Sequence, residues 1–181
     1  KKVKNQVLEQ VLVEDYAAEG KSLSRVNGKV IFIDGAVPGD VVDVLLGKNK
    51  KDWAEGKAIR MHTLSANRTE PFCSHFGICG GCKWQMLPYK KQLEYKQNEV
   101  EQNLRRLGRI SLPPVMPILG CDKTVRYRNK LEFTFSNHRY KTWDEIQKDP
   151  LPLQPRAERK EDPALGFHVP RIFDKVIDIT T

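Results

Sequence analysis

Alternating apolar and polar residues dominate the first third of the chain. Residues 22–26 and 29–33 alternate on either side of Asn27-Gly28, a dipeptide that favours a two-residue β-hairpin turn. Similar patterns predict further strands at residues 7–13, 41–46 and 53–61, with a lysine-rich loop at residues 47–52. Because a closed sheet leaves no exposed strand edges, this series predicts a five-stranded β-barrel of the OB type.

The spacing of apolar residues changes twice in the rest of the chain. From Pro88, which suits a first helical turn, apolar residues recur every three or four positions up to Leu107, and Gly108 can end this helix as its C′ residue. Residues 125–136 alternate as a half-buried strand with a basic outer face. A long loop is expected at residues 143–163, and two final strands at residues 165–168 and 175–179.

The predicted fold class is therefore mixed β and α+β, in three parts. Residues 1–62 form the barrel, and residues 63–86 form a linker and a cysteine-rich loop. Residues 87–181 form a helix and part of an α+β domain.

Three of the four cysteines lie close together, as Cys73, Cys79 and Cys82. Thiolates are soft metal ligands, and Gly80-Gly81 lets the backbone turn so that two sulfurs face one metal. Buried free thiols or a disulfide would not explain two glycines between two cysteines. Zinc and an iron–sulfur cluster both fit this spacing. The fourth ligand stays open between the isolated Cys121 and His75, which lies inside the loop.

Composition indicates a cytoplasmic, globular protein without a membrane partner or an evident obligate protein partner. No run of about 18 apolar residues is present, and the N-terminus lacks the apolar stretch of a signal peptide. Clustered cysteines fit a reducing compartment. The formal net charge is +8, and residues 83–141 carry the whole surplus. Such a segment predicts contact with a phosphate backbone, with solvated surface lysines as the alternative.

Two groups of basic residues are candidates for RNA phosphate contacts. The first group lies in the predicted loop at residues 47–52 and in the strand after it. The second lies on the outer face of the strand predicted at residues 125–136. The candidates are Lys48, Lys50, Lys51, Lys57, Arg60, Arg126, Arg128 and Lys130.

The motif C-x5-C-G-G-C-x2-Q, preceded by Arg68 and Pro71, resembles the cluster-binding segment of the RumA-type RNA (uracil-5-)methyltransferases. Residues 19–20 and 35–40 resemble a TRAM domain, and residues 127–133 resemble the central domain of that family. The resemblance implies a TRAM barrel, a [4Fe-4S] cluster and a C-terminal domain that transfers a methyl group from S-adenosylmethionine to C5 of uracil.

The same resemblance assigns the first three cluster ligands to Cys73, Cys79 and Cys82. It places the fourth shortly after a strand that matches residues 176–179, so a cysteine is expected beyond Thr181 and Cys121 is not a ligand. The family's glycine-rich methyl-donor loop and catalytic cysteine segment do not occur in this sequence. We therefore expect an N-terminal portion without catalytic residues that is inactive alone.

The parent enzyme is expected to act in rRNA processing, with 23S ribosomal RNA favoured over tRNA as its target. A zinc-stabilised RNA-binding adaptor without catalytic activity is the alternative. A ferredoxin-like electron carrier is disfavoured, because its four cysteines would form a compact set.

Overall fold

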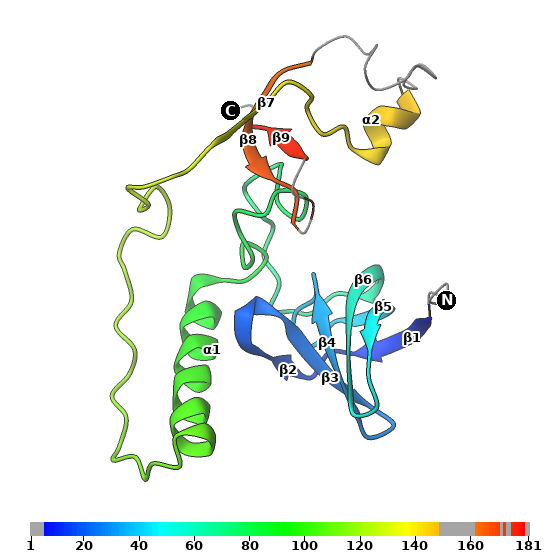
Figure 1. Cartoon of the computed structure of the whole chain (residues 1–181). Helices are drawn as coiled ribbons and strands as arrows, with labels where there is room; N and C mark the ends of the chain where they lie inside the picture. The colour runs from blue at the N-terminus through cyan, green and yellow to red at the C-terminus, as the bar shows by residue number, and fades with distance from the viewer. Residues whose placement is uncertain (1–5, 149–161, 171, 173–174, 180–181) are drawn as a thin grey trace. The chain divides into compact units, whose positions relative to one another are not determined.

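The computed structural model describes residues 6–148, 162–170, 172 and 175–179. The chain divides into two compact units (Figure 1). Unit 1 comprises residues 1–72 and 84–124, and unit 2 comprises residues 73–83 and 125–181. The cysteine loop is therefore assigned to unit 2, whereas the segments on either side of it in the sequence belong to unit 1.

Unit 1 contains a six-stranded sheet in the order β1-β5-β6-β4-β3-β2. The strands are β1 (Val7–Leu12), β2 (Asp15–Tyr16), β3 (Ser22–Val26), β4 (Lys29–Asp34), β5 (Val41–Asn49) and β6 (Trp53–Thr63). The two ends of this order, β1 and β2, are separated in the chain by only two residues, and the Glu14 N–H donates to the Leu23 carbonyl on β3 at 2.9 Å. The continuous stretch from β1 to β2 thus pairs with β5 at one edge of the sheet and with β3 at the other edge. This double pairing closes the sheet into the expected OB-like barrel.

Two details of the barrel differ from the prediction. The sheet has six strands rather than five, because the two-residue β2 is too short to produce an alternating pattern. Strand β5 also continues through Asn49, so Lys48 lies in a strand and not in the predicted loop. The predicted hairpin is confirmed: β3 pairs antiparallel with β4, and both Asn27 (φ 51°) and Gly28 (φ 78°) adopt the positive φ of a type I′ turn.

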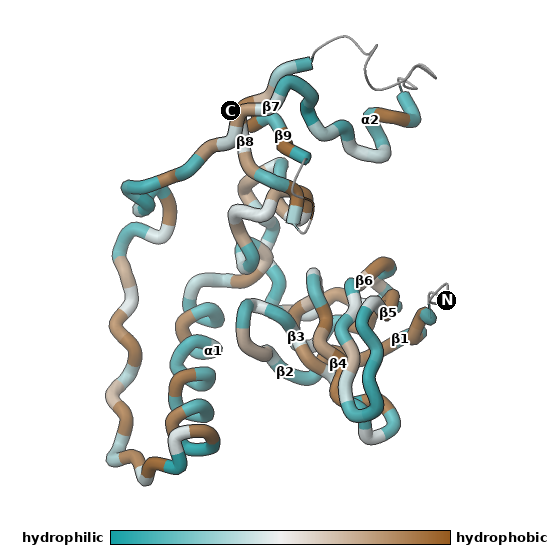
Figure 2. Tube along the Cα trace, viewed as in Figure 1, coloured by the Kyte–Doolittle hydropathy of each residue, from teal (hydrophilic) through white to brown (hydrophobic). Residues whose placement is uncertain are grey.

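The interior of the barrel is aliphatic, and hydrophobic and hydrophilic residues alternate along its strands (Figure 2). This alternation follows from the period of two along a strand, which directs every second side chain inward. The buried cluster contains Val11, Val13, Ile31, Ile33, Ala36, Val42, Val44, Leu46 and Ala54.

The carboxylate of Asp40 is fully buried and ties the predicted linker to the barrel. It accepts hydrogen bonds from the N–H groups of Val37 at 2.7 Å and Ser65 at 2.9 Å. Arg68 donates to it through Nε at 2.9 Å and Nη2 at 2.7 Å. Burial raises the pKa of Asp40, but these hydrogen bonds outweigh it and hold the pKa below its usual value. The segment after β6 is thus anchored.

The predicted helix is present as α1 (Tyr89–Gln102), which continues as a π-helical turn, η2 (Asn103–Leu107). Its first half packs on the barrel through Tyr16, whose ring centre lies 4.4 Å from that of Tyr95 and 5.4 Å from that of Trp84. The predicted C′ role of Gly108 is wrong, because its φ is −72° and not left-handed. A short 3-10 turn, η1 (Ala18–Gly20), precedes β3.

Unit 2 contains a three-stranded antiparallel sheet of β7 (Thr134–Ser136), β8 (Ala164–His168) and β9 (Val176–Asp178). The last two strands confirm the prediction. The long strand at residues 125–136 does not form: only β7 is extended and paired, and Arg126 has a φ of 54°. Alternation alone does not make a strand, because an isolated strand leaves its backbone groups without partners in the sheet.

A short helix, α2 (Trp143–Lys148), replaces the start of the predicted loop. A capping box explains this difference: the Glu145 N–H donates to Thr142 Oγ1 at 3.3 Å, and the Thr142 N–H donates to Glu145 Oε2 at 2.8 Å. The rest of that loop, residues 149–161, lies outside the described residues.

Replacing Arg68 with alanine is expected to destabilise unit 1 by about 3 kcal/mol, because it leaves the buried Asp40 carboxylate without its charged partner. Urea unfolding followed by circular dichroism measures this loss. Arg25→Ala is the matched control, because Arg25 pairs with Glu14 at an exposed site and should contribute less than about 1 kcal/mol. Equal losses for the two variants would contradict the role assigned to Asp40.

Candidate nucleic-acid interface and metal-binding loop

The stem of the cysteine loop is closed by a backbone hydrogen bond within unit 1. The Thr69 N–H donates to the Met86 carbonyl at 2.9 Å, and the side-chain amide of Gln92 donates to the carbonyls of Trp84 and Leu87. The segments that enter and leave the loop are therefore held side by side. Fixing the ends of a loop in this way reduces the entropy that its closure around a ligand would cost.

The loop itself, residues 73–83, folds as a series of tight turns in unit 2. The Phe76 N–H donates to the Cys73 carbonyl at 3.0 Å, and the Cys79 N–H donates to the His75 carbonyl at 2.9 Å. The Gly81 N–H donates to Cys79 Sγ at 3.2 Å. Backbone donors of this kind stabilise thiolate sulfur in iron–sulfur sites.

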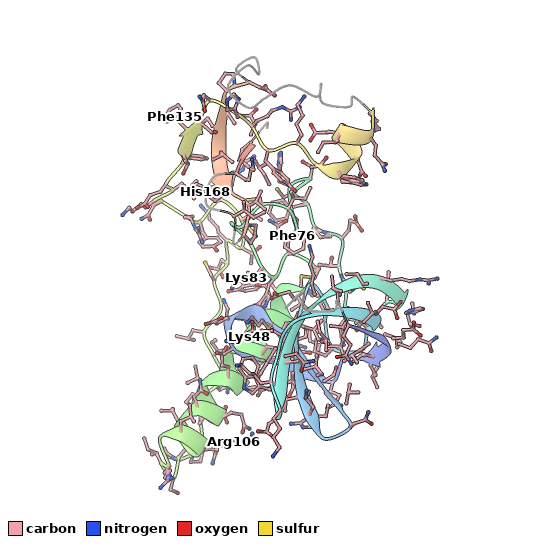
Figure 3. The ribbon with its side chains drawn as sticks, turned by 45° about the vertical axis from the view of Figure 1, so that its right-hand side comes forward. Lys48, Phe76, Lys83, Arg106, Phe135 and His168 are labelled. Atoms are coloured by element: carbon pink, nitrogen blue, oxygen red, sulfur yellow. The ribbon has the colours of Figure 1, made fainter. Side chains whose placement is uncertain are left out.

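Gly80 holds the loop against the sheet of unit 2. The Gly80 N–H donates to the His168 carbonyl on β8 at 3.2 Å, and a Cβ at Gly80 would lie only 3.1 Å from that oxygen. A larger residue at this position would push the loop away from β8. Figure 3 labels His168 together with Phe76 and Lys83 of the loop. Close approach to β8 is a role for Gly80 that the sequence did not indicate.

The donor set of the loop is chemically suited to a soft metal. None of the four cysteines forms a disulfide within the described parts of the chain; Cys73 and Cys79 are half-buried and Cys82 is exposed. Burial raises the pKa of Cys79 and the nearby thiols of Cys82 and Cys73 act in the same direction, whereas the hydrogen bond from the Gly81 N–H lowers it. Among the residues that the structure describes, no three Cys, His, Asp or Glu side chains converge closely enough to hold a metal ion. Metal binding by the loop thus stays a prediction.

Cys121 belongs to unit 1 and not to the unit that holds the other three cysteines. Its thiol donates to the Lys123 carbonyl at 3.2 Å, and its N–H donates to Tyr89 Oη at 2.8 Å. These local contacts give Cys121 an ordinary structural setting.

The five basic candidates of the barrel are all exposed, on the hairpin formed by β5 and β6. Lys48 lies at the end of β5, and its Nζ is 4.9 Å from the ring centre of Trp53 (Figure 3). Trp53 meets Phe32 edge to face, with ring centres 6.3 Å apart. Lys50 and Lys51 occupy the turn, and Lys57 and Arg60 follow on β6.

Sequence reasoning missed this aromatic pair. Trp53 and Phe32 are neighbours because β4 and β6 pair in parallel, with Val30 opposite Trp53. Such pairing between strands more than 20 residues apart leaves no local pattern in the sequence. Single-stranded RNA binds proteins by stacking its bases on aromatic side chains beside lysine and arginine. The outer face of the barrel therefore offers both kinds of contact.

The structure places two basic candidates of unit 2 beside the cysteine loop. Arg128 and Lys130 line an open cavity of about 610 Å³ together with Gly80 and Gly81. Lys130 also forms an exposed ion pair with Glu132 at 3.2 Å, a contact that a phosphate can replace at little cost. Arg126 is exposed on the same segment, although not on the strand face where it was predicted.

The barrel is identified by comparison as a TRAM domain, since residues 2–59 match the model of that family. The chain is also similar to proteins named as RNA methyltransferases. It is 53% identical over 163 residues to one from Bacteroides thetaiotaomicron and 43% identical over 167 residues to one from Porphyromonas gingivalis. These matches cover 90% and 92% of this chain but 34% and 35% of the relatives.

A third relative has a more specific name. The 23S rRNA (uracil(1939)-C(5))-methyltransferase RlmD of Vibrio vulnificus is 38% identical over 123 residues, which are 68% of this chain and 28% of that protein. The chain thus carries a TRAM domain and is similar to bacterial proteins named RNA methyltransferases, of whose length it spans about a third. None of the helices in the described parts of the chain is long and apolar enough to cross a lipid bilayer.

Proposed function

We propose that this chain is the RNA-recognition and iron–sulfur portion of a cytoplasmic, S-adenosylmethionine-dependent RNA uracil-5-methyltransferase that acts on ribosomal RNA. The observation that carries the proposal is the joint occurrence of a TRAM domain and a cysteine motif in a chain related to RNA methyltransferases. The name of the Vibrio vulnificus relative supports uracil C5 of 23S rRNA as the target. The chain is expected to be inactive alone.

RNA binding in this proposal depends on exposed cations in both units. Phosphates of the RNA backbone attract lysine and arginine and release condensed counterions when they bind. In unit 1 these cations lie along the β5–β6 hairpin, with Lys48 next to the Trp53 ring. In unit 2, Arg128 and Lys130 lie beside the cysteine loop. Stacking on the aromatic pair of the barrel would add affinity for unpaired bases.

The cluster in this proposal is held by Cys73, Cys79 and Cys82, with a fourth ligand from outside the described residues. When bound, a [4Fe-4S] cluster would contribute folding free energy to unit 2, because it would join thiolates of a loop made mainly of turns. The closed stem at Thr69 and Met86 and the contact of Gly80 with β8 support this role, since they limit the freedom of the loop before a metal binds.

Anaerobically purified full-length protein is expected to be brown and to contain iron and acid-labile sulfide. Cys79→Ser should abolish the visible absorbance, because it removes a thiolate ligand. Cys121→Ser is the matched control and should retain the absorbance, since the hydrogen bonds of Cys121 run to Lys123 and Tyr89, which both belong to unit 1. Stoichiometric zinc without visible absorbance would contradict the cluster and favour the zinc-stabilised adaptor.

The triple variant Arg126→Ala, Arg128→Ala and Lys130→Ala is expected to bind RNA more weakly, to a similar degree across RNA sequences. Each lost phosphate contact should reduce the slope of log affinity against log salt by about one. Fluorescence anisotropy between about 50 and 200 mM salt measures both quantities. Lys148→Ala, an exposed cation on α2 of the same unit, is the control. Unchanged affinity of the triple variant would remove these residues from the RNA-binding surface.

A further inference from the structure

The mouth of the barrel contains a cavity of about 380 Å³ that shares only Lys51 with the basic candidates described above. It opens between the β3–β4 turn, the β5–β6 turn and the residues that lead into β1. Its floor is aliphatic: Ile31 and Leu46 are buried, and Leu8 and Val26 pack against the same core. This volume lies within the range of small-ligand sites, which are mostly apolar with a few polar groups at defined positions.

The rim of the cavity carries a row of hydrogen-bonded polar side chains. Lys29 Nζ donates to Asn49 Oδ1 at 2.7 Å, and Asn49 Nδ2 donates to Gln6 Oε1 at 3.2 Å. Asn27 and Lys51 complete the rim on the two turns. These hydrogen bonds are exposed, so a ligand can replace them at small net cost.

The chemistry of the cavity matches one unpaired nucleotide. A carboxamide offers both donors and an acceptor, which is what the edge of a nucleobase requires. An aliphatic floor suits the apolar face of the base, and Lys29 and Lys51 supply positive charge for its phosphates, against the single acidic rim residue Asp52. Bases in an RNA duplex are paired and stacked, so only a single-stranded segment can insert one.

We infer that the barrel mouth binds one unpaired nucleotide of a single-stranded RNA, with its base on the aliphatic floor, its edge at Asn49 and a phosphate at Lys51. This inference rests on the proposed RNA-binding function and deepens it. The surface of cations contacts any phosphate backbone. The subsite at the barrel mouth would add selectivity for unpaired RNA.

The test uses the full chain and a fluorescently labelled oligouridylate, with an RNA duplex of equal charge for comparison. Asn49→Ala should weaken oligouridylate binding roughly three- to tenfold without changing the salt slope, because it removes hydrogen bonds and no charge. Lys51→Ala should reduce the slope by about one. Asn98→Ala, an exposed amide on α1, should change neither quantity. Duplex affinity should be the same for Asn49→Ala and the unaltered chain.

A second measurement does not depend on the folding of a variant. Titration of the unaltered chain with uridine 5′-monophosphate should shift the backbone amide NMR signals of Gly28, Ile31 and Asn49. Two results would show that the nucleotide subsite is wrong while the proposed function stands. In the first, the chain binds oligouridylate but these signals do not move. In the second, Asn49→Ala binds oligouridylate as tightly as the unaltered chain does. If neither RNA binds at all, the proposed RNA-binding function fails with it.

Discussion

The buried Asp40 carboxylate is the interaction on which the arrangement of unit 1 most depends. It joins the turn before β5, the residue Ser65 after β6 and the guanidinium of Arg68. A buried charge without its partner is strongly destabilising, so the carboxylate is stable only when the linker is docked. Closure of the barrel and anchoring of the segment that leads to the cysteine loop are thereby coupled in one ionic contact.

A second constraint follows from this anchoring. The chain leaves the barrel near Arg68, forms the cysteine loop and returns to the barrel at Trp84, which packs on Tyr16. The hydrogen bond from Thr69 to Met86 closes the stem between these points. The loop therefore has fixed ends and a turn-rich interior, an arrangement in which a bound cluster would order few additional residues.

Local signals in the sequence predicted much of this fold, and non-local pairing explains what they missed. Asn27-Gly28 predicted its hairpin because the turn chemistry is contained in two residues. Residues 125–133 alternate like a strand yet remain unpaired, because strand formation also requires a partner edge. The contact between Phe32 and Trp53 and the proximity of Arg128 to Gly80 depend on the tertiary fold, so the candidate surfaces could be predicted only as separate residues.

RNA recognition by these surfaces can be measured by photo-crosslinking the full chain to a single-stranded RNA that carries 4-thiouridine. Mass spectrometry of the crosslinked peptides then identifies the residues in contact. We expect crosslinks to residues 27–31 and 48–57 at the barrel and to residues 126–132 beside the cysteine loop. Crosslinks confined to the exposed face of α1, or crosslinks that high salt does not reduce, would contradict RNA recognition by these surfaces.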